Sequence, residues 1–171
     1  MPLSQTHHDL LDPSPELVRP LSLSIDASLE ESRARRLVQV AQQLYTFWHT
    51  GDPRHLRLAV DESFVDNTLP AGRPQGIDGP TTASAAFRAA VPHLTCELSD
   101  LLVVGDKLAV RLRFRGTFTG TFNGVRGEGQ PIDFVAFDIQ HVPGDRIIED
   151  WHLEDNLTFL LQAGLASVRG A

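Results

Sequence analysis

The stretch that decides the fold is "PIDFVAFDIQHVPGDRIIEDWHLED", residues 131–155. Two runs rich in apolar residues flank the short turn at residues 143–145, a pattern typical of a β-hairpin. The second run also carries acidic side chains, namely Glu149, Asp150, Glu154 and Asp155, together with a tryptophan and a histidine. A buried charge without a partner costs several kcal/mol. The mixture therefore indicates that part of this strand faces a pocket.

A helical half precedes the strands. In residues 28–52, apolar side chains recur at spacings of three and four residues, which predicts a helix that begins with a Ser28–Glu31 capping box and ends at Gly51. Residues 53–60 predict a short second helix, and residues 81–92 predict an alanine-rich third one. Between these two helices, residues 63–69 have the pattern of a short strand.

From residue 93 the pattern changes to the period of strands. Residues 107–120 alternate cleanly, with apolar residues on one face and Arg111 and Arg113 on the other, which is typical of a half-buried strand. Residues 156–165 predict a closing helix. Helices followed by a run of antiparallel strands favour an α+β fold. We expect residues 28–171 to form one domain, preceded by an irregular, proline-interrupted extension at residues 1–27.

Composition limits the classes of partner. The formal charge of −7 argues against nucleic acid, because phosphate binding favours a basic face. No apolar run approaches the ~20 residues that a membrane span needs, and the N-terminus lacks the pattern of a secretory signal. We therefore expect a soluble, cytoplasmic protein with no membrane partner. The single cysteine, Cys96, allows no disulfide within the chain, and its strand-like surroundings predict a small core residue.

The second strand of the hairpin offers one candidate acid–base residue. A period of two puts Glu149, Trp151, Leu153 and Asp155 on the face of Ile147, and we expect this face to be interior because it carries the large apolar residues. Asp155 would then lie at the inner end of the strand, where it could donate or accept a proton. The alternative is that it only caps the final helix, and the spacing alone favours the cap.

The first strand of the hairpin offers further candidates. Asp138 and Gln140 share a face with Phe134, whereas His141 lies on the opposite face. A carboxylate and an imidazole on adjacent strands could form an acid–base pair, or simply a structural hydrogen bond. Asn67 could polarise a carbonyl group, although asparagine also favours turns. Motifs for a serine nucleophile, a phosphate loop, a zinc protease or a dinucleotide site are absent from the sequence.

Several stretches, in this order, resemble the SnoaL-like polyketide cyclases and predicted ester cyclases: "GD" (51–52), "FVDN" (64–67), "GDKLAVR" (105–111) leading into "RGTFTG" (115–120), and "GDRIIEDW" (144–151) followed by Asp155. The resemblance extends from residue 34 to 166. It implies the nuclear-transport-factor-two-like fold, a cone-shaped α+β barrel in which a curved antiparallel sheet wraps around N-terminal helices. It also implies a homodimer packed through the sheet.

The same resemblance implies an intramolecular aldol-type cyclisation by an acidic side chain, with no metal or organic cofactor. By position it makes Asp155 the acid–base residue. We expect His141 or Asp138 to tune it, and a small, apolar, polyketide-like carbonyl compound to be the substrate. The expected substrate contacts are Asn67, Trp151, Tyr45, Phe47 and Gln140.

Two other kinds of function remain open from the sequence. An isomerase, dehydratase or epoxide hydrolase could use the same scaffold. An epoxide hydrolase would need an Asp–Arg–Asp arrangement, with Arg111 and Arg113 pointing inward against their alternation. A non-catalytic ligand-binding or dimerisation module would instead have a filled interior, without a cavity beside Asp155.

Overall fold

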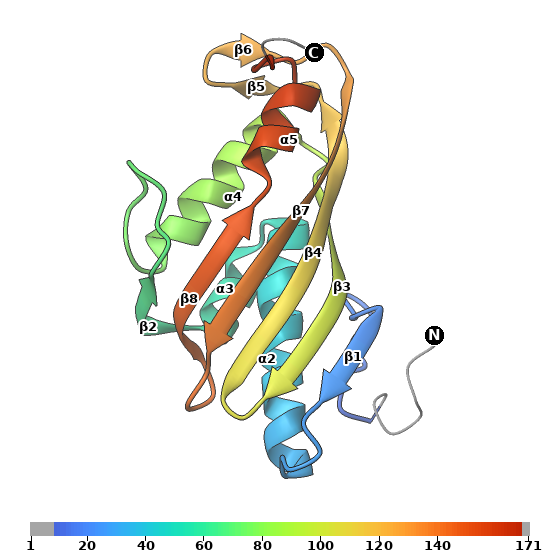
Figure 1. Ribbon diagram of the computed structural model, residues 1–171, viewed down its shortest axis with the longest axis vertical. Helices are drawn as coiled ribbons and strands as arrows, with labels where there is room; N and C mark the ends of the chain where they lie inside the picture. Colours follow the sequence, from blue (N-terminus) through green and yellow to red (C-terminus); the bar gives the residue numbers. More distant parts are fainter. Residues whose placement is uncertain (1–8, 169–171) are drawn as a thin grey trace.

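A curved six-stranded sheet wraps around a long helix in the computed structural model, which describes residues 9–168 (Figure 1). The sheet order is β1-β3-β4-β7-β8-β2. Its strands are β1 (Ser22–Ile25), β2 (Val60–Asp66), β3 (Thr95–Val104), β4 (Lys107–Phe118), β7 (Gln130–His141) and β8 (Ile147–Glu154). Two short strands, β5 (Thr121–Phe122) and β6 (Val125–Arg126), pair separately.

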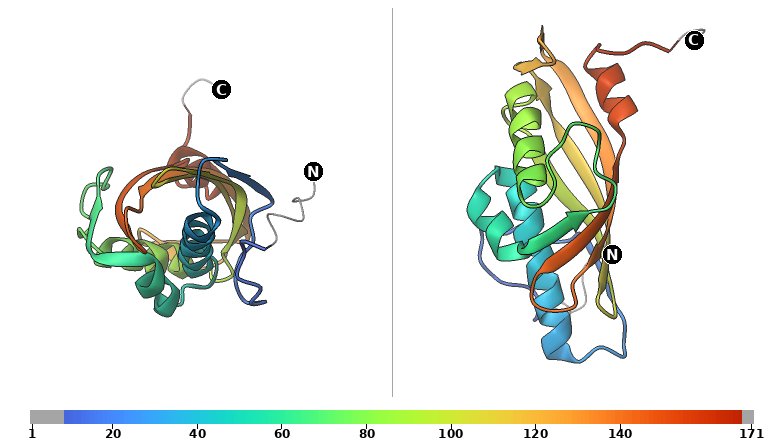
Figure 2. Two further views of the ribbon diagram at one scale, coloured as in Figure 1. Left: turned by 90° about the horizontal axis from the view of Figure 1, so that it is seen from below. Right: turned by 90° about the vertical axis from the view of Figure 1, so that its left-hand side faces the viewer.

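The helices are α2 (Glu31–Thr50), α3 (Pro53–Ala59), α4 (Asp78–Ala90) and α5 (Asn156–Gln162). Seen along its length, α2 lies inside the curve of the strands (Figure 2). The expected α+β fold is confirmed, with two differences from a closed antiparallel barrel. The sheet stays open, and its edge strands β1 and β2 run parallel to their neighbours β3 and β8. None of the helices within residues 9–168 is long and apolar enough to cross a membrane.

The two ends of α2 compare differently with the sequence prediction. Gly51 ends the helix with a φ of 79°, as expected from the freedom of glycine in the left-handed region. The predicted capping box is wrong, because Glu30 is the N-cap residue and makes no side-chain cap. The Ser28 hydroxyl and backbone N–H both donate to the Asp26 carboxylate, so a local turn takes the place of the cap.

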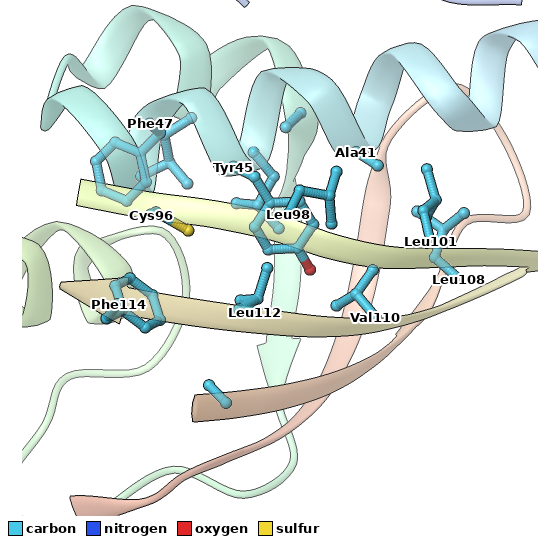
Figure 3. Close-up of a cluster of buried hydrophobic side chains, with 14 of the residues drawn as sticks. Ala41, Tyr45, Phe47, Cys96, Leu98, Leu101, Leu108, Val110, Leu112 and Phe114 are labelled. Atoms are coloured by element: carbon cyan, nitrogen blue, oxygen red, sulfur yellow. The ribbon is translucent and has the colours of Figure 1, made fainter. Parts of the chain in front are cut away.

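The core lies between α2 and the concave face of the sheet. Tyr45 and Phe47 from the helix pack against Leu98, Leu112 and Phe114 of the strands (Figure 3). The predicted alternation of β4 is confirmed, because its apolar residues are buried while the two arginines form ion pairs on the outer face, Arg111 with Asp100 and Arg113 with Asp133. Cys96 is a buried free thiol, as expected.

An N-terminal strap, residues 9–25, crosses the far side of α2. The buried Gln42 amide accepts a hydrogen bond from the Asp12 N–H and donates to the carbonyls of Asp12 and Val18. The Thr46 hydroxyl accepts from the Val18 N–H. Four residues of the segment that we expected to be irregular form β1, which pairs with β3. The strap thus covers Gln42 and Thr46 of α2 and supplies hydrogen-bond partners for both buried side chains.

Candidate active site

A cavity opens between α2, α4 and the concave face of the sheet. The enclosed space measures about 50 Å³, which is enough for a few water molecules or for one end of a larger ligand. Most of its wall is apolar, and its aromatic side chains are Trp48, Phe64, Phe87, Phe114 and Phe134. The rings of Phe114 and Phe134 are stacked, with 5.2 Å between their centroids. An apolar wall of this kind, with a few polar groups, is typical of a small-molecule site.

The polar part of the wall comes from one end of the sheet. It consists of Asp66 at the end of β2, Arg73 in the following loop, Asp138 on β7, and Asp150, His152 and Glu154 on β8. Neighbouring strands bring these groups together, because Asp138 pairs directly with His152 in the register of β7 and β8. The three β8 residues share a face because the side chains of a strand alternate.

Asp138 is buried and hydrogen-bonded from α2. The Tyr45 hydroxyl donates to its Oδ2 at 2.8 Å, and the Gln140 side-chain N–H donates in turn to the Tyr45 oxygen at 2.7 Å. Burial raises the pKa of Asp138 to about 6, although the hydrogen bond from Tyr45 opposes the rise. A carboxyl group with such a pKa changes its protonation state close to neutral pH, which suits a general base.

Asp150 has no side-chain hydrogen bond among the described residues, and its Oδ1 is buried without a partner. Burial raises the pKa of this carboxyl group well above its ordinary value, and the nearby charge of Asp138 adds to the rise. A neutral carboxylic acid that faces a cavity can donate a proton at neutral pH. Burial thus raises the pKa of both carboxyl groups, and the hydrogen bond from Tyr45 opposes the rise only at Asp138.

His152 lies between two carboxylates. Its Nε2 is 2.9 Å from Asp66 and its Nδ1 is 3.3 Å from Glu154. Burial by itself lowers the pKa of His152, but the hydrogen bonds and charges of Glu154 and Asp66 outweigh burial and raise it to about 9. Arg73 approaches Glu154 at 3.7 Å. The cluster is thus a fixed imidazolium held by two acidic side chains, beside the two carboxyl groups described above.

The sequence profile of the SnoaL-like polyketide cyclases matches residues 38–163, most of the chain. The chain belongs to this family. A search of curated proteins finds no match. Among solved structures, a Bacillus cereus protein assigned as a polyketide cyclase is 46% identical, with a TM-score of 0.82 over 90% of this chain and 97% of that one.

Two further structures extend the comparison. IdmH from Streptomyces antibioticus, also assigned as a polyketide cyclase, is 28% identical, with a TM-score of 0.65 over 73% of this chain and 96% of that one. A Catenulispora acidiphila protein with a ketosteroid isomerase-like fold is 16% identical, with a TM-score of 0.58 over 74% of this chain and 93% of that one, and it bears on the fold alone. This SnoaL-like protein is an enzyme of the lyase or isomerase type, with a cyclase-type or isomerase-type role.

Asp155 does not reach the cavity of this SnoaL-like chain. It is exposed and caps α5, where its carboxylate accepts from the backbone N–H and the hydroxyl of Thr158, and these bonds lower its pKa. It borders only an open depression on the outer face, next to Phe137 and Leu153. The interior position expected for it is therefore wrong, and the alternative, a helix cap, is what the structure has.

The reason for this error lies at the start of β8. Ile147 is buried and lines the cavity as expected, but Asp150 lines it too, so the strict alternation of the strand changes between them. The pairing with β2 shifts its register at this place, between Val60 and Val65. The residues expected inside beyond Ile147 consequently lie on the outer face, where Glu149 bonds to His141.

The other predicted site residues fall into two groups. Asp138, Gln140 and Tyr45 come together in one hydrogen-bonded chain beside the cavity. Of these three, Asp138 lines the cavity itself. The other four predicted residues do not line it. His141 lies on the outer face between Glu149 and Asp106, and Asn67 is exposed. Trp151 is on the outer face under the Lys107 ammonium group, and Phe47 is in the core, with Trp48 in contact with the cavity instead.

The sequence reasoning missed Asp66, Arg73, Asp150, His152 and Glu154 as site residues. One signal could have found three of them. Asp150, His152 and Glu154 stand at alternate positions, and three ionisable groups on one strand face indicate a polar row that needs partners. The loop that carries Arg73 contains no such pattern.

The arginines of β4 point outward, so the inward Arg111 and Arg113 that an epoxide hydrolase would need are not found. Within residues 9–168, no group of three histidine, cysteine or acidic side chains is arranged to hold a metal ion.

Proposed function

We propose that this protein is a cofactor-independent cyclase that closes a ring in a small, apolar, polyketide-like carbonyl compound by an intramolecular aldol-type reaction. One observation carries the proposal. Two buried carboxyl groups with raised pKa values, Asp138 and Asp150, face the same largely apolar cavity. A pair of titratable groups whose environments push their pKa values apart supplies both an acid and a base at neutral pH.

In the proposed reaction, one carboxyl group is the base. Its carboxylate takes a proton from the carbon between two carbonyl groups, so a C–H bond breaks and an O–H bond forms. The other carboxyl group, still protonated, gives its proton to the oxygen on which negative charge develops. The resulting enol carbon attacks a second carbonyl group of the same molecule. The proton on the enol oxygen then returns to the second carboxyl group, which had donated it. The new alkoxide takes the proton of the first carboxyl group.

The aromatic part of the wall supports an apolar substrate. In the wall of the cavity, Phe114 packs against both Trp48 and Phe134. Burial of an apolar ligand against such side chains is favourable by about 25 cal/mol per Å² of buried apolar area. It also displaces water, which strengthens the electrostatic interactions of the two carboxyl groups. An isomerase would use the same first proton transfer and return the proton at another carbon.

A hydrogen-exchange assay tests the first step without knowledge of the natural substrate. The probe is ethyl benzoylacetate in D₂O, and the measurement is loss of its methylene proton signal by NMR. We expect the wild-type protein to accelerate the exchange above buffer and with preference for one of the two hydrogens. The control is the double variant Asp138→Asn/Asp150→Asn, which keeps the shape of the cavity. Equal exchange with both proteins would contradict the proposal.

We also propose a homodimer through the outer face of the sheet. Phe137, Ile139 and Leu153 are at least half exposed there, and the register of β7 and β8 puts Phe137 opposite Leu153 and Ile139 opposite Trp151. Ion pairs of the β4 arginines border this apolar band on one side. A second copy related by a two-fold axis would cover the band with itself, because it is self-complementary.

Substitution of the band tests the dimer. We expect Phe137→Arg and Leu153→Arg each to reduce the mass in solution from twice 18.8 kDa to the mass of a single chain. Light scattering after size-exclusion chromatography measures this mass. Leu58→Arg on α3 is the matched control, since Leu58 is an equally exposed apolar residue away from the band. A wild-type protein that is already monomeric, or variants that stay dimeric, would rule the interface out.

A further inference from the structure

Two oxygen atoms in the interior wall are buried without a hydrogen-bond partner in the described part of the chain, Oε1 of Gln140 and Oδ1 of Asp150. Their residues stand directly opposite each other in the register of β7 and β8, and both side chains are on the concave face. Opposite side chains of neighbouring strands have Cβ atoms about 4.5–5.5 Å apart, within reach of a direct contact. Buried polar atoms without partners are rare enough to require an explanation.

The two oxygens can satisfy each other only if one of them carries a proton. An amide oxygen is always an acceptor, whereas a protonated carboxyl group has an O–H to donate. The donor must therefore be Asp150. In that form its O–H donates to Oε1 of Gln140, and both unpartnered atoms are accounted for by one hydrogen bond.

The other end of the Gln140 amide fixes the direction of the next bonds. Its Nε2 donates to the Tyr45 oxygen, and the Tyr45 hydroxyl donates its only proton to Oδ2 of Asp138. Burial and the charge of Asp138 raise the pKa of Tyr45 well above its ordinary value, so the phenol stays protonated. Asp138 accepts this bond as a carboxylate.

We propose that Gln140 and Tyr45 are positioning residues that join the two carboxyl groups into one directed hydrogen-bond chain, in which Asp150 keeps the proton and Asp138 is the carboxylate. The roles of Asp150 as the acid and Asp138 as the base rest on the proposed function. The hydrogen-bond chain itself does not rest on the proposed function. It also predicts that the pair holds one proton, since the network has a donor for every acceptor only with one proton present.

Charged and titratable groups from the neighbouring elements do not distinguish the two carboxyl groups. Those that face the pair are Cys96 on β3, Asp66 on β2, Arg73 in the loop, and His152 and Glu154 on β8. The His152 imidazolium favours the charged form of both carboxyl groups, whereas Asp66 and Glu154 oppose it. These influences act on both members of the pair. The difference between the members comes from the chain, which gives a donor to Asp138 and an acceptor to Asp150.

The chain can also reverse after a proton has been transferred. Once Asp138 has gained a proton and Asp150 has lost one, Asp138 can donate to the Tyr45 oxygen, and the Tyr45 hydroxyl can turn toward Gln140. The amide then turns over, so its oxygen accepts from Tyr45 and its N–H donates to the Asp150 carboxylate. Each bond of the first arrangement has a counterpart in the second, so the same residues stabilise the states before and after enolisation.

Carboxyl titration by NMR tests the chain without any substrate. The protein is labelled with ¹³C at the aspartate carboxyl groups, and the two signals are assigned with Asp138→Asn and Asp150→Asn. In Tyr45→Phe, Asp138 loses its donor, and we expect its pKa to rise by about one unit. The released amide of Gln140 can then donate to Asp150, whose pKa should fall by a similar amount. The matched control is Thr46→Val, which removes a buried hydroxyl from the next residue of α2 and should move neither signal.

A charge effect through space could also lower the pKa of Asp150, so a second background is needed. In Gln140→Leu, the chain predicts that Tyr45→Phe no longer lowers the pKa of Asp150, because the connecting amide is gone. A fall that persists in this background would overturn the proposal, and so would signals that shift in the same direction in Tyr45→Phe. Opposed shifts in a protein without exchange activity would support the chain and reject the proposed function. Exchange activity with no opposed shifts would reject the chain alone.

Discussion

The variant Asp138→Asn is expected to lose about 10²–10⁴-fold in the rate of hydrogen exchange and, at the same time, to become more stable. Loss of rate follows because the amide cannot take a proton from carbon. The gain in stability follows because the wild-type carboxyl group is buried at 7% exposure, where its charged form is disfavoured. Asparagine still offers an oxygen to the Tyr45 hydroxyl, so the hydrogen bond at this place remains available.

The sign of the stability change depends on pH. The pKa of Asp138 is about 6 in the folded chain, against 3.8 for the ordinary group, so the folded state binds the proton more tightly. Its favourable contribution is present below the unfolded pKa and is lost as pH rises through 6. At about pH 7.5 the ionised group lowers the free energy of unfolding by up to about 3 kcal/mol, at about 1.36 kcal/mol per pKa unit. Urea unfolding should show Asp138→Asn more stable there, with the difference gone near pH 4.

Asp155→Ala serves as the comparison for this variant. Its carboxylate is exposed and bonds only to Thr158, so we expect normal exchange activity and a small loss of stability from the missing helix cap. The opposite pattern, with activity lost in Asp155→Ala and kept in Asp138→Asn, would restore the assignment that the family resemblance implied.

The largest expected loss of stability is in His152→Gln. This change leaves the Asp66 and Glu154 carboxylates beside each other, with side-chain exposures of only 6% and 14% and without their shared cation. Breaking a buried ion pair by removing one partner costs about 3–5 kcal/mol. We expect a loss of this size in the free energy of unfolding at about pH 7, measured by urea unfolding.

The stabilising contribution of His152 depends on pH. The folded pKa of His152, about 9, lies above the ordinary value of 6.5, so its contribution is fully present below pH 6.5 and is lost as pH rises through 9. The difference between wild type and His152→Gln should accordingly shrink between about pH 7 and pH 10.

His141→Gln is a matched control, because His141 also lies between two carboxylates, but on the exposed outer face. Exposed ion pairs contribute at most about 1 kcal/mol. Equal losses in the two variants would mean that burial does not distinguish the clusters.

The part of the site on β7 could be predicted because that strand alternates without interruption over twelve residues. Asp138 and Gln140 follow Phe134 and Ala136 on the buried face, and counting by two finds them. Tyr45 could be predicted as well, because it lies on the apolar face of a regular helix. The fold was similarly accessible, since it depends on long periodic segments and on turn residues such as Gly51.

Counting by two groups Asp150, His152 and Glu154 on one face of β8, but it could not predict that this face is the interior one. The alternation of inward and outward side chains breaks between Ile147 and Asp150. This break accompanies a register shift against β2, a strand far away in the sequence. The apolar residues of β8 were also misleading, since Trp151 and Leu153 belong to the outer face. A sheet with apolar residues on its convex side gives no local indication of which side is the interior. Contacts with other strands decide which side is the interior. Asp66, which bonds to His152, is eighty-six positions away from it in the sequence.

The N-terminal strap has a practical consequence. The segment that matches the family begins at residue 38, inside α2, and omits the strap altogether. A version of the protein trimmed to the matched residues would uncover the Gln42 amide and the Thr46 hydroxyl, together with the surfaces against which Leu11 and Leu23 pack. Such a fragment should expose apolar surface and aggregate on expression. The residues that the family profile matches are therefore fewer than the residues that the fold uses.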